Sequence, residues 1–194
     1  MDALSFLRAD HESVLGMFEV LEDAPKGTGS AHSGLDTMVT NLVIAESQHE
    51  AIEEQLFWPL VRKVLDDGDA LADQAVDQEQ AGKKLLQRLE DGSPGEADYH
   101  EALAEFIKAG REHIAFEQDQ VWPLLGAAVE QAELDQLGDK LATAKKIAPT
   151  RPHPDTPPNA MIQGTMGAAA AVVDHVRDAV SGRAADNPPD PQSH

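Results

Sequence analysis

Residues 49–61 read HEAIEEQLFWPLV, and residues 113–125 read HIAFEQDQVWPLL. An offset of 64 aligns His49 with His113 and Glu53 with Glu117, and both copies continue into Trp-Pro-Leu. Side chains four residues apart lie on one face of an α-helix, one turn from each other. A single copy would be typical of an ordinary amphipathic helix. Because the pattern occurs twice, it predicts two halves of a transition-metal site and hence a centre for two ions.

Composition limits the other classes of function. The chain has 194 residues, which is typical of one domain with an appendage. It has no cysteine, so disulfides, thiolate metal sites and cysteine nucleophiles are excluded. The net charge of −20 would be repelled by nucleic acids and anionic membranes, so neither is an expected partner. The first residues lack a basic region followed by an apolar run, and we expect a cytoplasmic protein.

Apolar spacing predicts an all-α fold. Helices are expected over about 2–22, 34–66, 70–90 and 96–129, with Asp2 as the N-cap of the first. Short connections indicate an up-down-up-down four-helix bundle, with Trp58 closing one end and Pro59 kinking or interrupting its helix. Residues 130–146 are either a cap on this bundle or a continuation of its last helix. The predicted domain is therefore 1–146, and 147–194 form a C-terminal extension with a proline-rich linker, a short helix over 164–181 and a disordered tail.

The first and third helices add two candidate ligands. His11 occupies a core position of the first helix, where a hydrogen-bonded structural histidine is the alternative to a ligand. An offset of 68 aligns Glu79 with His11. A carboxylate in a core is costly unless it is paired or binds a metal. The alternatives are a solvated Glu79 paired with Lys83, or Gln78 in its place.

Six residues are thus expected to converge at one level of the bundle: His11, His49, Glu53, Glu79, His113 and Glu117. Imidazoles with carboxylates suit iron or manganese better than copper. Glu53 and Glu117 come from opposed helices and are placed to bridge two ions. Carboxylates nearby would accept the second N–H of the imidazoles, and Glu46 is the candidate for His49. Gly82 and Gly110, one turn from Glu79 and His113, leave either room for a small ligand or space for close helix packing.

The histidine on the first helix and the two HxxxE motifs, followed by LFWP or VWPL, resemble the hemerythrin-like HHE cation-binding family, of the actinobacterial and mycobacterial type. The resemblance covers residues 1 to about 130. It implies two iron ions joined by an oxo or hydroxo bridge, with His11, His49 and His113 as terminal ligands and Glu53 and Glu117 as bridges. The family has one or two histidines on the third helix, where this chain has Glu79 followed by Lys83. The other five histidines fit no ligand position: His32, His100, His153, His175 and His194.

This departure bears on function. Carboxylates stabilise ferric iron more than imidazoles do, so the site favours redox turnover of peroxide, a catalase-like activity, over reversible carriage of O2. The alternative is a non-catalytic protein that binds or senses O2, NO or iron, with the C-terminal extension transmitting the signal. A metal-free acidic helical interaction module is a third hypothesis. A ferritin-type oxidase is disfavoured because that class places Glu before His at i, i+3. No protein partner can be named from the sequence.

Overall fold

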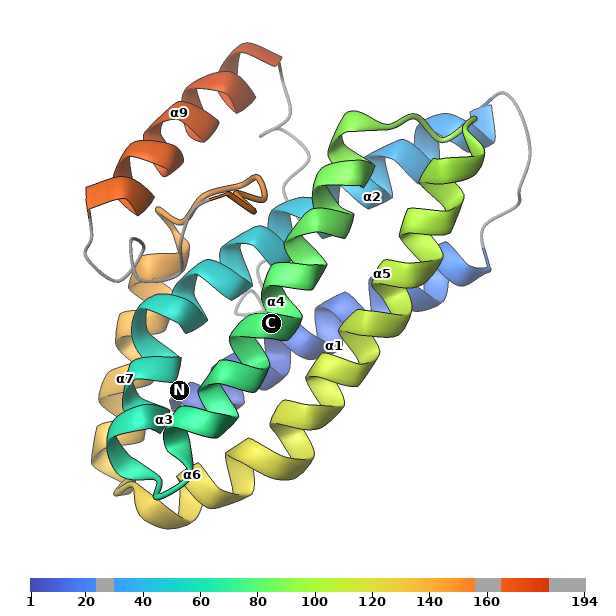
Figure 1. Ribbon diagram of the computed structural model, residues 1–194. Helices are drawn as coiled ribbons and strands as arrows, with labels where there is room; N and C mark the ends of the chain where they lie inside the picture. Colours follow the sequence, from blue (N-terminus) through green and yellow to red (C-terminus); the bar gives the residue numbers. More distant parts are fainter. Residues whose placement is uncertain (24–29, 156–164, 182–194) are drawn as a thin grey trace.

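The computed structural model describes residues 1–23, 30–155 and 165–181. All secondary structure in these ranges is helical, which confirms the predicted all-α class. Four long helical arms lie side by side as an antiparallel bundle (Figure 1). The elements in chain order are α1 (Ala3–Glu22), α2 (Ser30–Ile52), η1 (Glu53–Phe57), α3 (Trp58–Val64), α4 (Gly68–Asp91), α5 (Ala97–Phe116), η2 (Glu117–Val121), α6 (Trp122–Ala128), α7 (Gln131–Lys145) and α9 (Thr165–Ser181).

The start of α1 follows its sequence signal. Asp2 has extended backbone geometry and accepts a 3.0 Å hydrogen bond from the backbone N–H of Ser5, so it is the predicted N-cap. The loop after α1, including residues 24–29, lies outside the described residues. After α4, Gly92 begins the connection to α5 in extended conformation.

The hydrophobic core is divided along the bundle axis. One cluster gathers around Trp58, Trp122 and Leu125 and extends to α7. The other gathers around Phe18, Tyr99 and Phe106 toward the opposite end. Each long arm changes from apolar to polar side chains between these clusters, at the level of His11 and His49. The bundle therefore encloses a polar layer between two apolar plugs.

Both Trp-Pro sequences follow a turn of π-helix. The backbone N–H of Trp58 donates to the carbonyl of Glu53, five residues earlier, and Trp122 does the same to Glu117. Proline has no N–H to continue the usual i→i−4 ladder, so a wider turn precedes each one. We predicted a kink or interruption at Pro59. The structure confirms an interruption of the α-helix just before Pro59, in the form of a π-helical turn, and the same turn precedes Pro123.

The chain after the bundle covers its outside. Val129 is extended and ends α6, so α7 is a separate cap and not a continuation of the last helix. It packs on α1 so closely that a Cβ at Gly138 would stand 2.2 Å from the carbonyl oxygen of Met1. Pro149 and Pro152 lie buried in the segment that follows, beside Ser47 of α2. This covering explains why the end of α2 and the start of η1 are buried on nearly all sides between residues 42 and 54.

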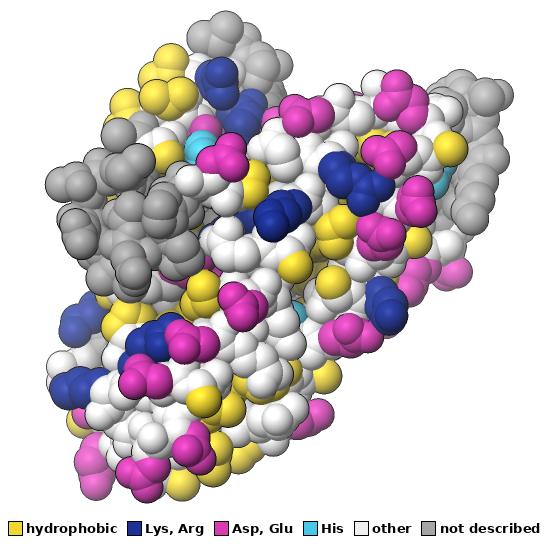
Figure 2. Space-filling view, viewed as in Figure 1, with side chains coloured by type: hydrophobic (Ala, Val, Ile, Leu, Met, Phe, Trp, Pro, Cys, Tyr) yellow, Lys and Arg dark blue, Asp and Glu magenta, His cyan; other side chains and the backbone are white. Residues whose placement is uncertain are grey.

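The short C-terminal helix is confirmed as α9, and its docking face is polar. Asp174 and Asp178 are buried, whereas Val172, Val173 and Val176 are more than half exposed. These valines contribute to the apolar surface over α9 in Figure 2. The buried side contacts Arg151, which joins Asp178 at 2.7 Å and Glu90 of α4 at 3.0 Å. The predicted tail from residue 187 onward lies outside the described residues, and no described helix is long and apolar enough to cross a membrane.

Candidate metal centre

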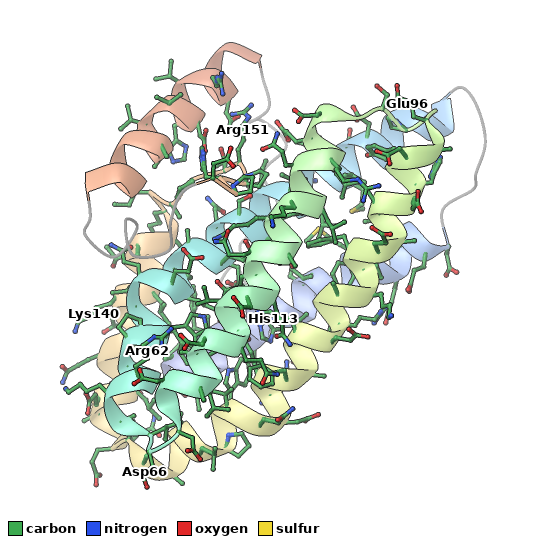
Figure 3. All side chains as sticks on the ribbon, viewed as in Figure 1. Arg62, Asp66, Glu96, His113, Lys140 and Arg151 are labelled. Atoms are coloured by element: carbon green, nitrogen blue, oxygen red, sulfur yellow. The ribbon has the colours of Figure 1, made fainter. Side chains whose placement is uncertain are left out.

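The structure brings all six predicted residues into the polar layer of the bundle, in two groups. The first group contains His11, His49, Glu53 and Glu117, and the second contains Glu53, Glu79 and His113. In each group, one ligand atom per residue lies within 4.8 Å of the others. Glu53 belongs to both groups. The side chains come from all four arms, and His113 reaches from α5 toward α4 (Figure 3).

The first group has the spacing of ligands around a single ion. The Nε2 atoms of His11 and His49 lie 3.1 Å apart. Glu53 Oε2 lies 3.2 Å from His49 Nε2, and Glu117 Oε2 lies 3.1 Å from His11 Nε2. Ligand atoms about 2.1 Å from a common ion stand roughly 3.0–3.4 Å apart at octahedral or tetrahedral angles. The group therefore fits one transition-metal ion.

The second group shares one carboxylate, Glu53, with the first, and a second carboxylate, Glu117, lies beside both. Glu117 directs Oε2 at His11 and Oε1 at His113, whose Nε2 is 3.6 Å away. Glu53 contributes to both groups and Glu79 only to the second. Two carboxylates that each face two donor groups have the arrangement of bridging ligands. The residues present thus fit a pair of ions, with a histidine pair on one side and a histidine and a glutamate on the other.

Several atoms in this layer are buried without a hydrogen-bond partner. They are the carboxylate oxygens of Glu53 and Glu117, Oε2 of Glu79 and Nε2 of His113. Leaving polar groups unsatisfied in a core costs free energy, and native proteins rarely do so without a reason. The orphaned atoms are those that face one another across the two groups. Bound cations would satisfy them all together.

Burial favours the neutral form of all six groups. Burial raises the pKa of Glu53 well above its usual value, and the Glu117 and Glu79 carboxylates raise it further. Burial likewise raises the pKa of Glu79 and of Glu117. It lowers the pKa of His11 to about 4 and lowers the pKa of His49 and His113. Burial therefore favours imidazoles that are free to coordinate and makes protons compete with a metal for the carboxylates, so metal affinity should rise with pH.

The histidines of the two repeats each have a side-chain oxygen close to Nδ1. His49 Nδ1 is 3.3 Å from Oδ2 of Asp10, and His113 Nδ1 is 3.0 Å from Oε1 of Gln78. With an acceptor at Nδ1, the proton of each neutral ring lies there and Nε2 is left for a metal. Asp10 fills the role that we predicted for Glu46. That prediction is wrong because α1 places Asp10 directly against the ring of His49.

The offset of 68 could have identified these two residues, because it aligns Asp10 with Gln78 as it aligns His11 with Glu79. The alternative that places Gln78 inward in place of Glu79 is wrong. The structure places Glu79 in the centre, 1% exposed, with Gln78 on the far nitrogen of His113.

The tryptophans of the two repeats also line the centre. Nε1 of Trp58 donates a 2.6 Å hydrogen bond to Oε1 of Glu79. The ring of Trp122 stacks on His11, with centroids 5.0 Å apart and planes inclined by 12°. Trp58 belongs to the apolar cluster that extends to α7, and its contact with a candidate ligand was not foreseen from the sequence.

A second buried layer of charge flanks the second group. The ammonium group of Lys83 pairs with Glu54 rather than with Glu79. Glu50 is buried beside this pair, and a Cβ at Gly82 would stand 3.3 Å from its Oε1. A Cβ at Gly110 would stand 2.7 Å from the ring of Phe18. Side chains therefore occupy the space beside both glycines, which supports close packing over room for a ligand.

The remaining histidines lie away from the centre wherever the structure describes their side chains. His153 pairs with Asp174 at 2.9 Å, and His175 is exposed on α9. His100 contacts the ring of Tyr99. The side chains of His32 and His194 lie outside the described residues.

Comparison with known proteins gives one family. Residues 2–125 match the family model of the hemerythrin HHE cation-binding domain. An uncharacterised hemerythrin-like protein from Schizosaccharomyces pombe is 25% identical over 133 residues, which make up 68% of this chain and 66% of that protein, just under two thirds of its length. A crystal structure of a hemerythrin HHE cation-binding domain-containing protein from Mycobacterium kansasii, a homologue of Rv2633c, superposes with a TM-score of 0.63 at 20% identity. It covers 90% of this chain and 99% of its own.

Proposed function

The chain belongs to the hemerythrin HHE cation-binding family, and from this premise we propose that it holds two iron ions and disproportionates hydrogen peroxide. His11 and His49 would be terminal ligands of one ion, and Glu79 and His113 of the other. Glu53 and Glu117 would bridge the two. The observation that carries this proposal is the sharing of Glu53 between two donor groups, with Glu117 directing one oxygen toward a histidine of each.

The replacement of an imidazole by Glu79 favours turnover over oxygen carriage. Anionic oxygen donors suit the ferric state better than neutral imidazoles do, and Glu79 brings that charge to an ion with only one histidine. Two iron ions would supply a store for two electrons. Disproportionation needs no other reductant, because one peroxide gives two electrons and two protons and becomes O2, while a second accepts them and becomes two waters.

The protein side chains would bind, orient and shield the reactants. The apolar clusters on both sides exclude bulk water from the layer. Asp10 and Gln78 fix the rings of His49 and His113. The side chain of His113 is 13% exposed, whereas that of His49 is 4% exposed, so the second group lies nearer to solvent. A small ligand such as peroxide, O2 or NO would reach the centre most directly from that side.

Iron analysis and peroxide turnover test the proposal together. We expect about two irons per chain, the near-ultraviolet absorption of an oxo-bridged ferric pair, and O2 release on addition of peroxide. His49→Ala should abolish O2 release, and His175→Ala, on the exposed face of α9, should leave it unchanged. A colourless protein that takes up no iron would exclude the di-iron centre.

The same experiment separates the alternative function. A protein that binds or senses O2, NO or iron without turnover would contain the iron pair and its absorption band but release no O2. The cytoplasmic location and a role in peroxide defence are parts of this proposal as well. Cell fractionation, and peroxide survival of a strain that lacks the protein, would test them.

A further inference from the structure

We propose that Lys145, the last residue of α7, is a positioning residue of the metal centre that holds Asp10 against the ring of His49. The proposal rests on the metal centre described above and concerns a residue beyond it. The family model ends at residue 125, and α7 covers Gln131–Lys145. The helix that caps the bundle would thereby become part of the site.

A continuous line of contacts joins α7 to the centre. Nζ of Lys145 lies 2.6 Å from Oδ2 of Asp10. The same oxygen lies 3.3 Å from Nδ1 of His49, and Nε2 of that ring faces His11 and Glu53. One carboxylate oxygen therefore receives both the ammonium group and the imidazole N–H. Displacement of Asp10 would release the ring from its orientation toward the other ligands.

Asp10 needs a counter-charge to hold this position. Its side chain is only 2% exposed, and Oδ1 has no hydrogen-bond partner. An unpaired carboxylate in such a place would move toward water or take up a proton. Lys145 is 19% exposed, so its chain can remain near solvent while the ammonium group reaches inward.

The position of Lys145 is itself fixed from two other helices. The side-chain amide of Gln48 on α2 donates a 3.4 Å hydrogen bond to the carbonyl of Lys145. The ammonium group lies 5.8 Å from the ring centroid of Phe6 on α1. It also lies at the C-terminal end of α7, where the helix dipole favours a cation. Lys146, the next residue, is exposed and contacts none of these groups in the described part of the chain.

In the described part of the chain, a cation pairs with only one of the two side chains that support the imidazoles. Gln78, which occupies the corresponding place beside His113, is a neutral amide and needs no counter-charge. Asp10 is charged and receives Lys145. Lys145 thus accompanies the charged support, Asp10, and not the neutral support, Gln78. A positioning role for the lysine requires this difference.

The test is a cobalt titration of the full metal-free chain, with Lys145→Met, Lys145→Arg and Lys146→Met. Lys145→Met should weaken binding of the first Co²⁺ by about 10- to 100-fold, the effect usual for loss of an outer partner of a ligand. Lys145→Arg should restore most of the affinity, and Lys146→Met should match the wild type. In the Zn²⁺-loaded protein, the exchange-protected Nδ1 proton of His49 should be lost from the NMR spectrum of Lys145→Met only.

A double variant separates positioning from general stability. Asn in place of Asp10 keeps an acceptor for His49 without the charge, so Lys145→Met should have no further effect on Co²⁺ affinity in an Asp10→Asn background. An equal loss in both backgrounds, or wild-type affinity in Lys145→Met, would overturn the proposal. If the wild type itself binds no Co²⁺, the metal centre fails and not merely the role of Lys145.

Discussion

The first half of the bundle, α1 to α3, and the second half, α4 to α6, have the same framework but different candidate metal ligands. Each half supplies a histidine and a glutamate from an HxxxE motif that ends in a π-helical turn. Each also supplies one ligand from its preceding helix, and here they differ: His11 in the first half and Glu79 in the second. The candidate bridges are identical, and the difference falls on a candidate terminal ligand, where it would alter the redox chemistry of the proposed ions without disturbing their pairing.

The tryptophans beside His11 and Glu79 make different contacts, each suited to its neighbour. Trp122, from the second half, stacks its ring on the imidazole of His11. Trp58, from the first half, turns the N–H of its indole toward the carboxylate of Glu79. One tryptophan thus stacks its ring face on an imidazole, and the other donates its indole N–H to a carboxylate. This adjustment indicates that Glu79 is an integrated part of the site and not a substitution at a tolerant position.

The largest expected effect on metal content comes from removing Glu53, the residue that both donor groups share. Glu53→Ala should lose both ions, because Glu53 belongs to both donor groups. His113→Ala should lose the ion of the second group and retain the other. Iron content after desalting measures both, with His175→Ala as the control. Retention of two irons by Glu53→Ala would show that the carboxylate is not a bridge.

Making the halves alike is the next strongest test. Glu79→His, combined with Trp58→Phe so that no indole N–H is left without an acceptor, should raise the midpoint potential of the iron pair. An exchange of anionic for neutral ligands shifts such potentials on the order of 100 mV or more. Spectroelectrochemical titration measures the shift, and Trp58→Phe alone is the control. An unchanged potential would mean that Glu79 does not coordinate.

Some parts of the site could be predicted from the sequence, and others could not. The helices and all six clustered residues were predicted, because helical periodicity and two internal offsets determine which side chains face inward. The π-helical turns were not, since they depend on how proline alters the hydrogen bonds of the residues before it. The role given to Glu46 was wrong because the choice between two nearby carboxylates depends on the rotation of α1 against α2.

The C-terminal extension shows the same limit. Periodicity predicted α9 but could not show that it docks through Asp174 and Asp178 with its valines exposed. That orientation is determined by Arg151, whose place on the bundle no local pattern encodes. The contact of Lys145 with Asp10 joins residues 135 positions apart, and no local pattern in the sequence indicates it.

The supports of the two imidazoles should differ in strength. Asp10→Ala should weaken metal binding by about 10- to 100-fold and Gln78→Ala by about 10-fold or less. The reason is that a hydrogen bond to a carboxylate is roughly twice as strong as one to a neutral amide. Competition with a chromophoric chelator gives both affinities. Equal losses would show that the charge of Asp10 does not matter to the centre.

The smallest expected effect concerns Glu46 and Gly110, two aligned positions that hold no candidate metal ligand. Glu46 of the first half aligns with Gly110 of the second, which has no titratable group. Burial, with the charges of Asp10 and Glu117, raises the pKa of Glu46 from 4.5 to about 8 in the metal-free protein, while Lys145 opposes the shift. Folding then takes up a proton between these values, so this group makes stability fall as pH rises from about 4.5 to about 8 and level off above. Glu46→Gln should remove a slope of at most about 1.4 kcal/mol per pH unit.

Chemical denaturation of the metal-free protein at several pH values measures that slope. The other buried carboxylates give slopes of the same sign, so the difference between wild type and Glu46→Gln isolates the one group. Glu112→Gln is the matched control, because the Glu112 side chain is 67% exposed on α5. If Glu46→Gln leaves the slope unchanged, the carboxyl group of Glu46 is ionised in the folded protein and must have a cation beside it. Lys145, whose charge opposes the shift, is the candidate, and it would then serve Glu46 as well as Asp10.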